Sequence, residues 1–236
     1  MSSPQCCDNP PTLSSTSGSG RVEEVGGVKS YVSGSIDSNA AVVLVSDVYV
    51  YFHAWKRKLG DKVAAAGFYV VIPDLLYGDP YSTGQEFFSW LPSHSPDKGA
   101  EDTKPIISHL KSKGISAIGA AGFCWGAKVV AQLAKTDDIK AVVMLHPSLI
   151  SLDDIKEVKV PISVLGAEID QMSPPELVRQ FKDVVKPEPQ VDLHVKIFDG
   201  CVHGWTVRYD VEDATAVKRA EEAHQDMLDW FNKYVK

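Results

Sequence analysis

Residues 118–126 read IGAAGFCWG, and this stretch decides how the rest of the chain is interpreted. A run of small and apolar residues leads into Cys124, which has a glycine two positions away on each side. This is the nucleophile-elbow pattern G-x-Nuc-x-G, with cysteine in the place of serine. The run before the motif predicts a buried strand and residues 127–133 predict a helix, so Cys124 is expected on a sharp strand-to-helix turn.

The chemistry of such a turn suits a cysteine nucleophile. A helix N-terminus favours the thiolate, which is the nucleophilic form of the side chain. The backbone N–H of Trp125 is left free to donate to a developing oxyanion. The alternative is a buried cysteine in an ordinary tight turn. The correct flanking elements, and two partners found later in the chain, favour the nucleophile.

The partner base is expected to be a histidine in a loop late in the chain. His203 directly follows the last predicted strand and is the first choice, and His146, which ends an earlier strand, is the second. Three other histidines fall inside predicted helices or a strand and are expected to be structural or surface groups: His109, His194 and His224.

The acid that orients the histidine is expected after the preceding strand. Residues 166–170 read GAEID, and Asp170 is chosen because it stands deeper in the loop; Glu168 is the competitor, and helix capping is the alternative role for Asp170. The resulting chain order of Cys124, Asp170 and His203 is the order found in α/β-hydrolases.

After residue 20 the chain alternates between strand-like and helix-like patterns. Strands are predicted at 41–45, 69–72, 117–121, 141–145, 162–165 and 194–198, and helices at 55–66, 99–113, 127–133, 175–185 and 214–234. This alternation, with nearly continuous apolar strands, predicts an α/β fold with a mostly parallel sheet covered by helices on both faces. Residues 1–20 are expected to form an extended or flexible segment, and residues 21–236 a single α/β-hydrolase domain.

Composition narrows the classes of function. The net charge of −7 argues against a nucleic-acid partner, because phosphate binding needs clustered Lys and Arg. The four cysteines, including the adjacent pair Cys6-Cys7, fit neither a disulfide framework nor a zinc pattern, so no metal is expected. No secretory signal or membrane span is recognised, which favours a cytoplasmic protein with a small-molecule substrate. A monomer or weak homodimer is expected.

Together these motifs resemble the dienelactone hydrolase family over nearly all of residues 20–236, particularly its plant branch, which often carries the label endo-1,3;1,4-β-D-glucanase-like. The stretches that carry the resemblance are residues 64–74 (AAAGFYVVIPD), 78–81 (GDPY), 122–126 (GFCWG), 165–170 (LGAEID) and 203–205 (HGW). The resemblance implies a Cys124–His203–Asp170 triad that hydrolyses small cyclic esters or related acyl compounds without a cofactor.

The resemblance also implies roles outside the triad. It implies an oxyanion hole formed by the backbone N–H groups of Trp125 and Val48. Asp47 matches the position of a family glutamate that hydrogen-bonds the resting thiol, and Arg208 falls near an arginine that holds the substrate carboxylate. The side chains expected to line or tune the pocket are Tyr49, Phe52, His53, Tyr81 and Trp205.

One loop departs from the family pattern. The family reads approximately S-D-V-F-G-Y-E, whereas residues 46–53 read SDVYVYFH, so Val50 replaces a glycine and Phe52 replaces an acidic residue. A β-branched residue resists backbone geometry that glycine permits, so this loop is expected to be reshaped. Two alternatives follow: a cyclase, isomerase or lyase on the same fold, using His203 or His53 as acid or base, and a non-catalytic small-molecule binder. A glucanase is not favoured, because no pair of carboxylates in the sequence can be assigned to the two positions that flank a glycosidic bond.

Overall fold

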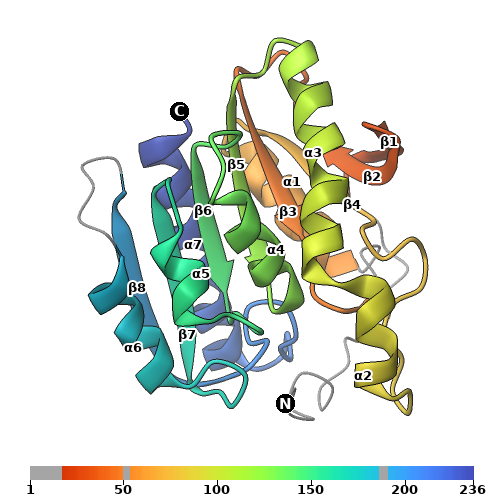
Figure 1. The fold of residues 1–236 in the computed structure, drawn as a ribbon. Helices are drawn as coiled ribbons and strands as arrows, with labels where there is room; N and C mark the ends of the chain where they lie inside the picture. The colour runs from red at the N-terminus through yellow and green to blue at the C-terminus, as the bar shows by residue number, and fades with distance from the viewer. Residues whose placement is uncertain (1–17, 50–53, 186–190) are drawn as a thin grey trace.

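The structure is a computed structural model that describes residues 18–49, 54–185 and 191–236. Its centre is a sheet of eight strands in the order β1-β2-β4-β3-β5-β6-β7-β8 (Figure 1). The strands are β1 (Arg21–Val25), β2 (Val28–Ser33), β3 (Ala40–Val45), β4 (Tyr69–Pro73), β5 (Ala117–Phe123), β6 (Ala141–Leu145), β7 (Ile162–Ile169) and β8 (Leu193–Val202). β1 pairs with β2 and β2 with β4 in antiparallel fashion, and every other pairing in the sheet is parallel.

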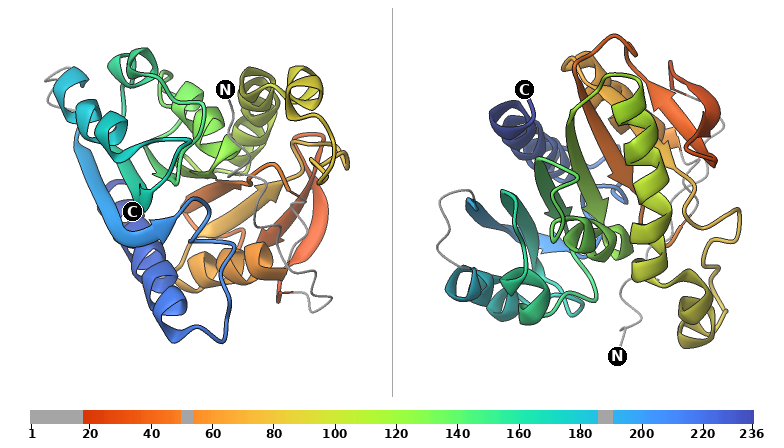
Figure 2. Two further views of the ribbon diagram at one scale, coloured as in Figure 1. Left: turned by 90° about the horizontal axis from the view of Figure 1, so that it is seen from below. Right: turned by 45° about the horizontal axis from the view of Figure 1, so that its top comes forward.

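Helices cover both faces of the sheet. They are α1 (Ala54–Ala65), α2 (Phe87–Trp90), α3 (Pro96–Ser112), α4 (Trp125–Leu133), α5 (Leu152–Lys156), α6 (Pro175–Val184) and α7 (Ala214–Tyr234), with a short 3-10 helix at Leu91–His94. Figure 2 shows α1 and α7 on one side of the sheet and α3, α4, α5 and α6 on the other. None of the helices within the described ranges is both long enough and apolar enough to cross a bilayer.

Two hydrophobic cores follow from this layering. Along β3, Val43 and Val45 point into the core beneath α3 and α4, whereas Val42 and Leu44 point into the core beneath α1 and α7. Side chains alternate across a strand in this way because successive Cβ atoms lie on opposite faces. Both faces of the central strands are therefore buried, which explains their almost uninterrupted apolar sequences.

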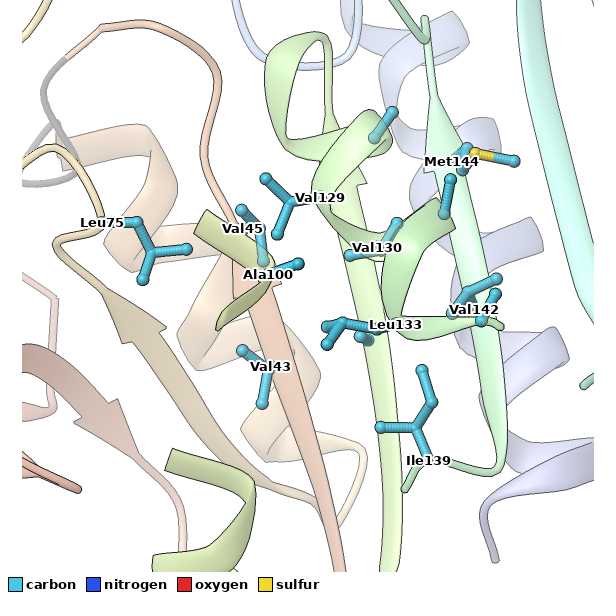
Figure 3. Close-up of a cluster of buried hydrophobic side chains, with 14 of the residues drawn as sticks. Val43, Val45, Leu75, Ala100, Val129, Val130, Leu133, Ile139, Val142 and Met144 are labelled. Atoms are coloured by element: carbon cyan, nitrogen blue, oxygen red, sulfur yellow. The ribbon is translucent and has the colours of Figure 1, made fainter. Parts of the chain in front are cut away.

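The core on the α3–α4 side packs the nucleophile-elbow helix onto the sheet. Figure 3 shows Val129, Val130 and Leu133 of α4 between the side chains of β3 and those of β6. All three are at most 1% exposed. This packing fixes α4, and with it the turn that precedes α4, relative to the carboxyl ends of the central strands.

The predicted α/β class and its parallel centre are confirmed, but several details differ. The antiparallel hairpin β1–β2 was not predicted, because β1 reads RVEEV, is mostly exposed and lacks a clear apolar pattern. The short helices α2 and α5 were also missed. The strand predicted at 162–165 extends to Ile169, because its pairing with β8 continues past an irregularity between Ala167 and Ile169. Residues 1–17 of the predicted N-terminal segment, including Cys6-Cys7, lie outside the described residues.

Candidate active site

Cys124 lies on the turn between β5 and α4. Its backbone has φ 53° and ψ −111°, a positive-φ conformation that non-glycine residues rarely adopt. The two flanking glycines make this turn possible. A Cβ on Gly122 would lie 2.1 Å from the Gly126 carbonyl oxygen, and a Cβ on Gly126 would lie 2.3 Å from the carbonyl oxygen of Val45. Gly126 is therefore required by the close approach of the turn to β3, and Gly122 by the tightness of the turn itself.

Backbone hydrogen bonds hold the turn in place. The Cys124 amide donates to the Leu145 carbonyl at the end of β6 (3.1 Å), and the Cys124 carbonyl accepts from the Ala127 and Ser148 amides (3.0 and 3.2 Å). Trp125 is the first residue of α4, so its amide has no intrahelical acceptor. Within residues 18–49, 54–185 and 191–236 that amide also has no other acceptor. It is a donor beside the Cys124 sulfur that remains available.

His203 and Asp170 meet across the carboxyl ends of β7 and β8. The Nδ1 of His203 lies 2.8 Å from Oδ2 of Asp170, and both side chains are at least 99% buried. Oδ1 of Asp170 accepts hydrogen bonds from the Met172 and Ser173 amides (2.8 and 3.2 Å). When the imidazole is neutral, a carboxylate held by two amides fixes its proton on Nδ1 and leaves Nε2 as the basic nitrogen.

Glu168, the alternative acid, lies elsewhere. Its side chain is exposed, and Oε2 accepts a hydrogen bond from the Gly200 amide at 2.6 Å. Glu168 still belongs to β7, and no hydrogen bond joins it to His203 among the described residues. The geometry thus brings together Asp170 and His203 and not Glu168.

Cys124 and His203 influence each other's protonation. Burial raises the pKa of the Cys124 thiol, but His203, Arg208 and Ser148 outweigh it, so that the pKa is lower than usual. Burial lowers the pKa of His203, but the Cys124 thiolate and the hydrogen bond to Asp170 raise it to about 9. The Nε2 of His203 is buried and makes no hydrogen bond of good geometry to any described residue. Cys124 and His203 thus interact, and among the described residues the Nε2 of His203 has no other hydrogen-bond partner.

His146, the second choice for the base, packs against the first. Its ring lies 5.2 Å from that of His203, edge to face, and its Nε2 lies 2.8 Å from Oγ1 of Thr206. Burial, followed by the positive charges of His203 and Arg208, lowers the pKa of His146 well below its ordinary value of 6.5. A neutral imidazole behind His203 supports that ring and avoids placing a second cation there.

Asp47 and Val48 lie at the carboxyl end of β3, next to the elbow. Oδ1 of Asp47 accepts hydrogen bonds from the Lys56 ammonium (2.7 Å) and the Tyr49 amide (3.1 Å), and Oδ2 lies 3.6 Å from Nη1 of Arg208. Among the described residues Asp47 makes no hydrogen bond to Cys124. The aspartate is thus occupied by cations, which differs from the thiol-binding role that the resemblance implies.

The aromatic residues expected at the pocket divide into two groups. Tyr49 and Tyr81 pack edge to face at 6.4 Å, and the Arg208 guanidinium lies 5.3 Å from the centre of the Tyr49 ring. Trp205 instead packs against His146 at 5.4 Å, within the core beneath α7. Phe52 and His53, with Val50 and Tyr51 of the same loop, lie outside the described residues.

A cavity of about 190 Å³ is lined by residues from the end of β8, the loop that follows it and the start of α7. Trp205 and Arg208 contribute to its wall, but Cys124 and His203 do not. Its remaining lining residues are Gly200, Cys201, Val202, Tyr209, Asp213, Thr215, Ala216 and Arg219. We therefore distinguish this cavity from the Cys124 site.

Two residues of the site were not found from the sequence. Oγ of Ser148 lies 3.5 Å from the Cys124 sulfur, and Lys56 is buried against Asp47. Ser148 follows a strand end at His146-Pro147, which was a usable indication. Nothing in the sequence indicates that Lys56 belongs to the site, because a lysine in an amphipathic helix is normally solvated. In the part of the chain that the structure describes, no cluster of His, Cys, Asp and Glu could hold a metal ion.

Comparisons with known proteins indicate the family to which the chain is related. Residues 28–235 match the model of the dienelactone hydrolase family. A protein of Zea mays named endo-1,3;1,4-beta-D-glucanase is 44% identical over 79% of this chain, and the chain spans 63% of that protein's length. The mouse carboxymethylenebutenolidase homolog is 30% identical over 92% of both chains.

Solved structures share the same fold. A Klebsiella pneumoniae protein provisionally described as a dienelactone hydrolase superimposes with a TM-score of 0.72 at 18% identity, covering 88% of this chain and 93% of its own. At that identity the likeness concerns the fold alone.

Proposed function

The chain belongs to the dienelactone hydrolase family, and from this premise we propose that it is a hydrolase of small esters or lactones. In this proposal Cys124 is the nucleophile, His203 is the general base and acid, and Asp170 orients His203. The observation that supports the proposal most is the arrangement of His203. Its Nδ1 binds a buried carboxylate at 2.8 Å, and its Nε2 is left for the thiol on the elbow.

The first half of the proposed reaction forms a thioester. His203 accepts the proton of Cys124, and the thiolate attacks the substrate carbonyl carbon, so that a C–S bond forms and the carbonyl electrons move onto oxygen. The backbone N–H groups of Trp125 and Val48 stabilise that oxyanion, each by about 3 kcal/mol. When the tetrahedral intermediate collapses, the C–O bond breaks and the leaving oxygen takes the proton from His203.

The second half releases the acid. His203 removes a proton from water, the resulting hydroxide adds to the thioester carbonyl, and the C–S bond breaks to regenerate the thiolate. In a lactone the leaving oxygen stays attached to the acyl group, so a single hydroxy acid is released. Arg208, beside Asp47 and over the Tyr49 ring, is the proposed contact for a carboxylate on the substrate.

A glucanase activity is not proposed for this chain. Hydrolysis of a glycosidic bond usually uses two carboxylates that flank it, one of them free to act as an acid. Asp170 is bound by His203 and two amides, and Asp47 by Lys56. Neither carboxylate is available for that chemistry.

The test compares ester hydrolysis by three proteins. Wild type should hydrolyse a p-nitrophenyl ester and an enol lactone, Cys124→Ala should lose at least about 10³-fold in kcat, and Cys124→Ser should retain a small residual rate. Cys201→Ala, which alters a buried cysteine outside the site, is the matched control and should keep the wild-type rate. Equal rates for wild type and Cys124→Ala would remove Cys124 from the mechanism. Turnover of a metabolite by Cys124→Ala without ester hydrolysis would favour a lyase or isomerase.

A further inference from the structure

Lys56 is a buried cation on α1 that the proposed mechanism does not use. Its side chain is 3% exposed, and its ammonium donates to Oδ1 of Asp47 at 2.7 Å and to the Tyr49 carbonyl at 3.1 Å. Burying an ammonium group costs several kcal/mol unless a partner compensates for it. A lysine at this place therefore calls for a reason beyond packing.

Hydrogen bonds from Lys56 bracket the backbone of Val48. The ammonium holds the side chain of the residue before Val48 and the carbonyl of the residue after it. Asp47 in turn accepts from the Tyr49 amide at 3.1 Å, and the Val48 carbonyl accepts from the Tyr81 amide at 2.9 Å. Together these bonds fix the turn 47–49 beside Cys124, and this turn carries the Val48 N–H.

Lys56 also balances charge around the sulfur. Asp47 is fully buried, and its pKa lies below the usual value. Burial raises this pKa, but the opposing effect of Lys56 and Arg208 is larger. The carboxyl group is thus an anion next to a site where a thiolate must form. The pKa of Lys56 is lower than usual: burial and Arg208 lower it, and the opposing effects of Asp47 and the Cys124 thiolate compensate only in part.

We propose that Lys56 is a positioning residue for the reaction at Cys124, because it fixes the turn that presents the Val48 N–H and offsets the negative charge of Asp47 beside the nucleophile. This inference rests on the proposed role of Cys124 as the nucleophile. Lys56 itself need not touch the substrate. Its effect passes through Asp47 and the backbone of residues 47–49.

Removal of Lys56 should change the pKa of Cys124 in one direction, which can be measured. The charged or titratable groups that surround the Cys124 sulfur come from separate elements: His203 and Arg208 from the loop after β8, His146 from the end of β6, Asp47 from the end of β3 and Lys56 from α1. Without Lys56, Asp47 would repel the thiolate with less compensation. The pKa of Cys124 should then rise, and the less ordered Val48 amide should bind the oxyanion less well.

The experiment measures the pH dependence of Cys124 alkylation in Lys56→Met and in wild type. Iodoacetamide is added at a series of pH values, and modification is quantified by mass spectrometry of the peptide that contains Cys124, so that other cysteines do not interfere. We expect the midpoint to rise by about one pH unit. We also expect kcat for a p-nitrophenyl ester to fall roughly ten-fold with KM changed less than about three-fold. Lys58→Met, on an exposed position of the same helix, is the control and should match wild type.

A double variant separates a charge effect from a loss of structure. Asp47→Asn in the Lys56→Met background removes both charges, and the alkylation midpoint should return toward that of wild type. Unchanged midpoint and kcat in Lys56→Met would overturn the proposal. If Lys56→Met does not fold, the single variant Asp47→Asn is compared with the double variant Asp47→Asn, Lys56→Met. An alkylation midpoint about one pH unit lower in the single variant, which keeps Lys56, supports the proposal. Equal midpoints contradict it.

Failure of this inference is distinct from failure of the proposed function. Should Cys124→Ala keep its turnover, Cys124 is not the nucleophile, whatever Lys56 does. Should Cys124→Ala be inactive while Lys56→Met behaves as wild type in both measurements, only the role of Lys56 is refuted.

Discussion

At the scale of single residues, the site combines a cysteine with a strained backbone and a histidine whose ring is held in place by Asp170. Asp170 does not reach the sulfur; its value lies in holding the His203 ring, since its second oxygen is itself held by two backbone amides. A carboxylate restrained in this way keeps the imidazole in one tautomer. Loss of that restraint should therefore affect the rate more than the fold.

Replacing Asp170 with Asn should lower kcat/KM for a p-nitrophenyl ester by about 10²-fold or more, because an amide NH2 opposite Nδ1 favours the wrong tautomer of His203. The matched change Glu168→Gln, on the exposed competitor, should leave kcat/KM within about two-fold of wild type, since the Gly200 amide can still be bound. A reversed order of effects, measured by steady-state kinetics, would assign the orienting role to Glu168.

The pH profile of hydrolysis should report the Cys124–His203 pair. The pKa of Cys124 is lowered and that of His203 is raised to about 9, which favours a thiolate together with an imidazolium over a range of pH that ends near 9. The kcat/KM of a neutral ester should rise as Cys124 ionises and fall above about pH 9, where His203 loses the proton needed by the leaving group. The two limbs belong to the pair rather than to either residue. A rate that keeps rising beyond pH 10 would argue against an imidazolium as the acid.

Motif and chain order allowed Cys124, Asp170 and His203 to be predicted as a set, because each follows the end of a strand in a parallel sheet. Lys56 and Ser148 could not be assigned. Their importance comes from contacts with residues distant in the sequence, and neither residue type is diagnostic by itself. The implied bond from Asp47 to the thiol illustrates the same limit, since a lysine from α1 occupies that carboxylate.

At the scale of elements, the elbow works because two backbones touch. The first turn of α4 rests on the end of β3. Position 126 must be glycine, because the Cβ of any other amino acid would obstruct that contact. The same contact brings the start of α4 against the end of β3, which leads into the turn 47–49. Geometry at one residue thus determines the relation between a helix and a strand.

Gly126→Ala should lower the free energy of unfolding by about 2 kcal/mol or more and should remove most esterase activity, because the new Cβ would lie 2.3 Å from the Val45 carbonyl oxygen. Gly166→Ala in β7 is the control, since its Cβ would meet Val178 at an ordinary 3.4 Å. Chemical denaturation of the two variants checks the difference. Similar stabilities for both would show that β3 can move away without cost.

The central strands were predictable because both of their faces are buried and their sequences are almost entirely apolar. The hairpin β1–β2 was not, because an exposed edge strand of charged residues resembles a linker. The carboxyl half of β7 was assigned to a loop for a similar reason: Glu168 and Ile169 are exposed, and the strand continues there because Ile169 pairs with Val202 of β8.

At the scale of the whole molecule, two cores lie on opposite faces of the sheet and polar residues are buried between the sheet and α7. His224 of α7 is 5% exposed, and its Nε2 lies 2.9 Å from the Thr206 carbonyl oxygen, in the loop that follows His203. Burial, and after it the charge of Lys62, lowers the pKa of His224 to about 4. The histidine is therefore neutral in the folded protein at all but acidic pH.

Acid should destabilise the protein through this residue. Between pH 6.5 and pH 4 the unfolded chain binds a proton at His224 that the folded chain does not, so the free energy of unfolding falls as the pH falls through this window. The loss should reach on the order of 2 kcal/mol at pH 5 relative to pH 7.5. His224→Gln should remove this contribution and make the dependence less steep, measured by denaturation at each pH, whereas His194→Gln at an exposed position should not. Identical slopes in all three proteins would contradict this account.

The most direct test of the central claim is to look for the acyl group on Cys124. Wild-type protein is quenched with acid during steady-state hydrolysis of a slow p-nitrophenyl ester, digested, and analysed by mass spectrometry. The account predicts the mass of one acyl group on the peptide that contains Cys124, removable by hydroxylamine and missing from Cys124→Ala. Rapid hydrolysis with no adduct on that peptide, together with unchanged turnover by Cys124→Ala, would contradict it.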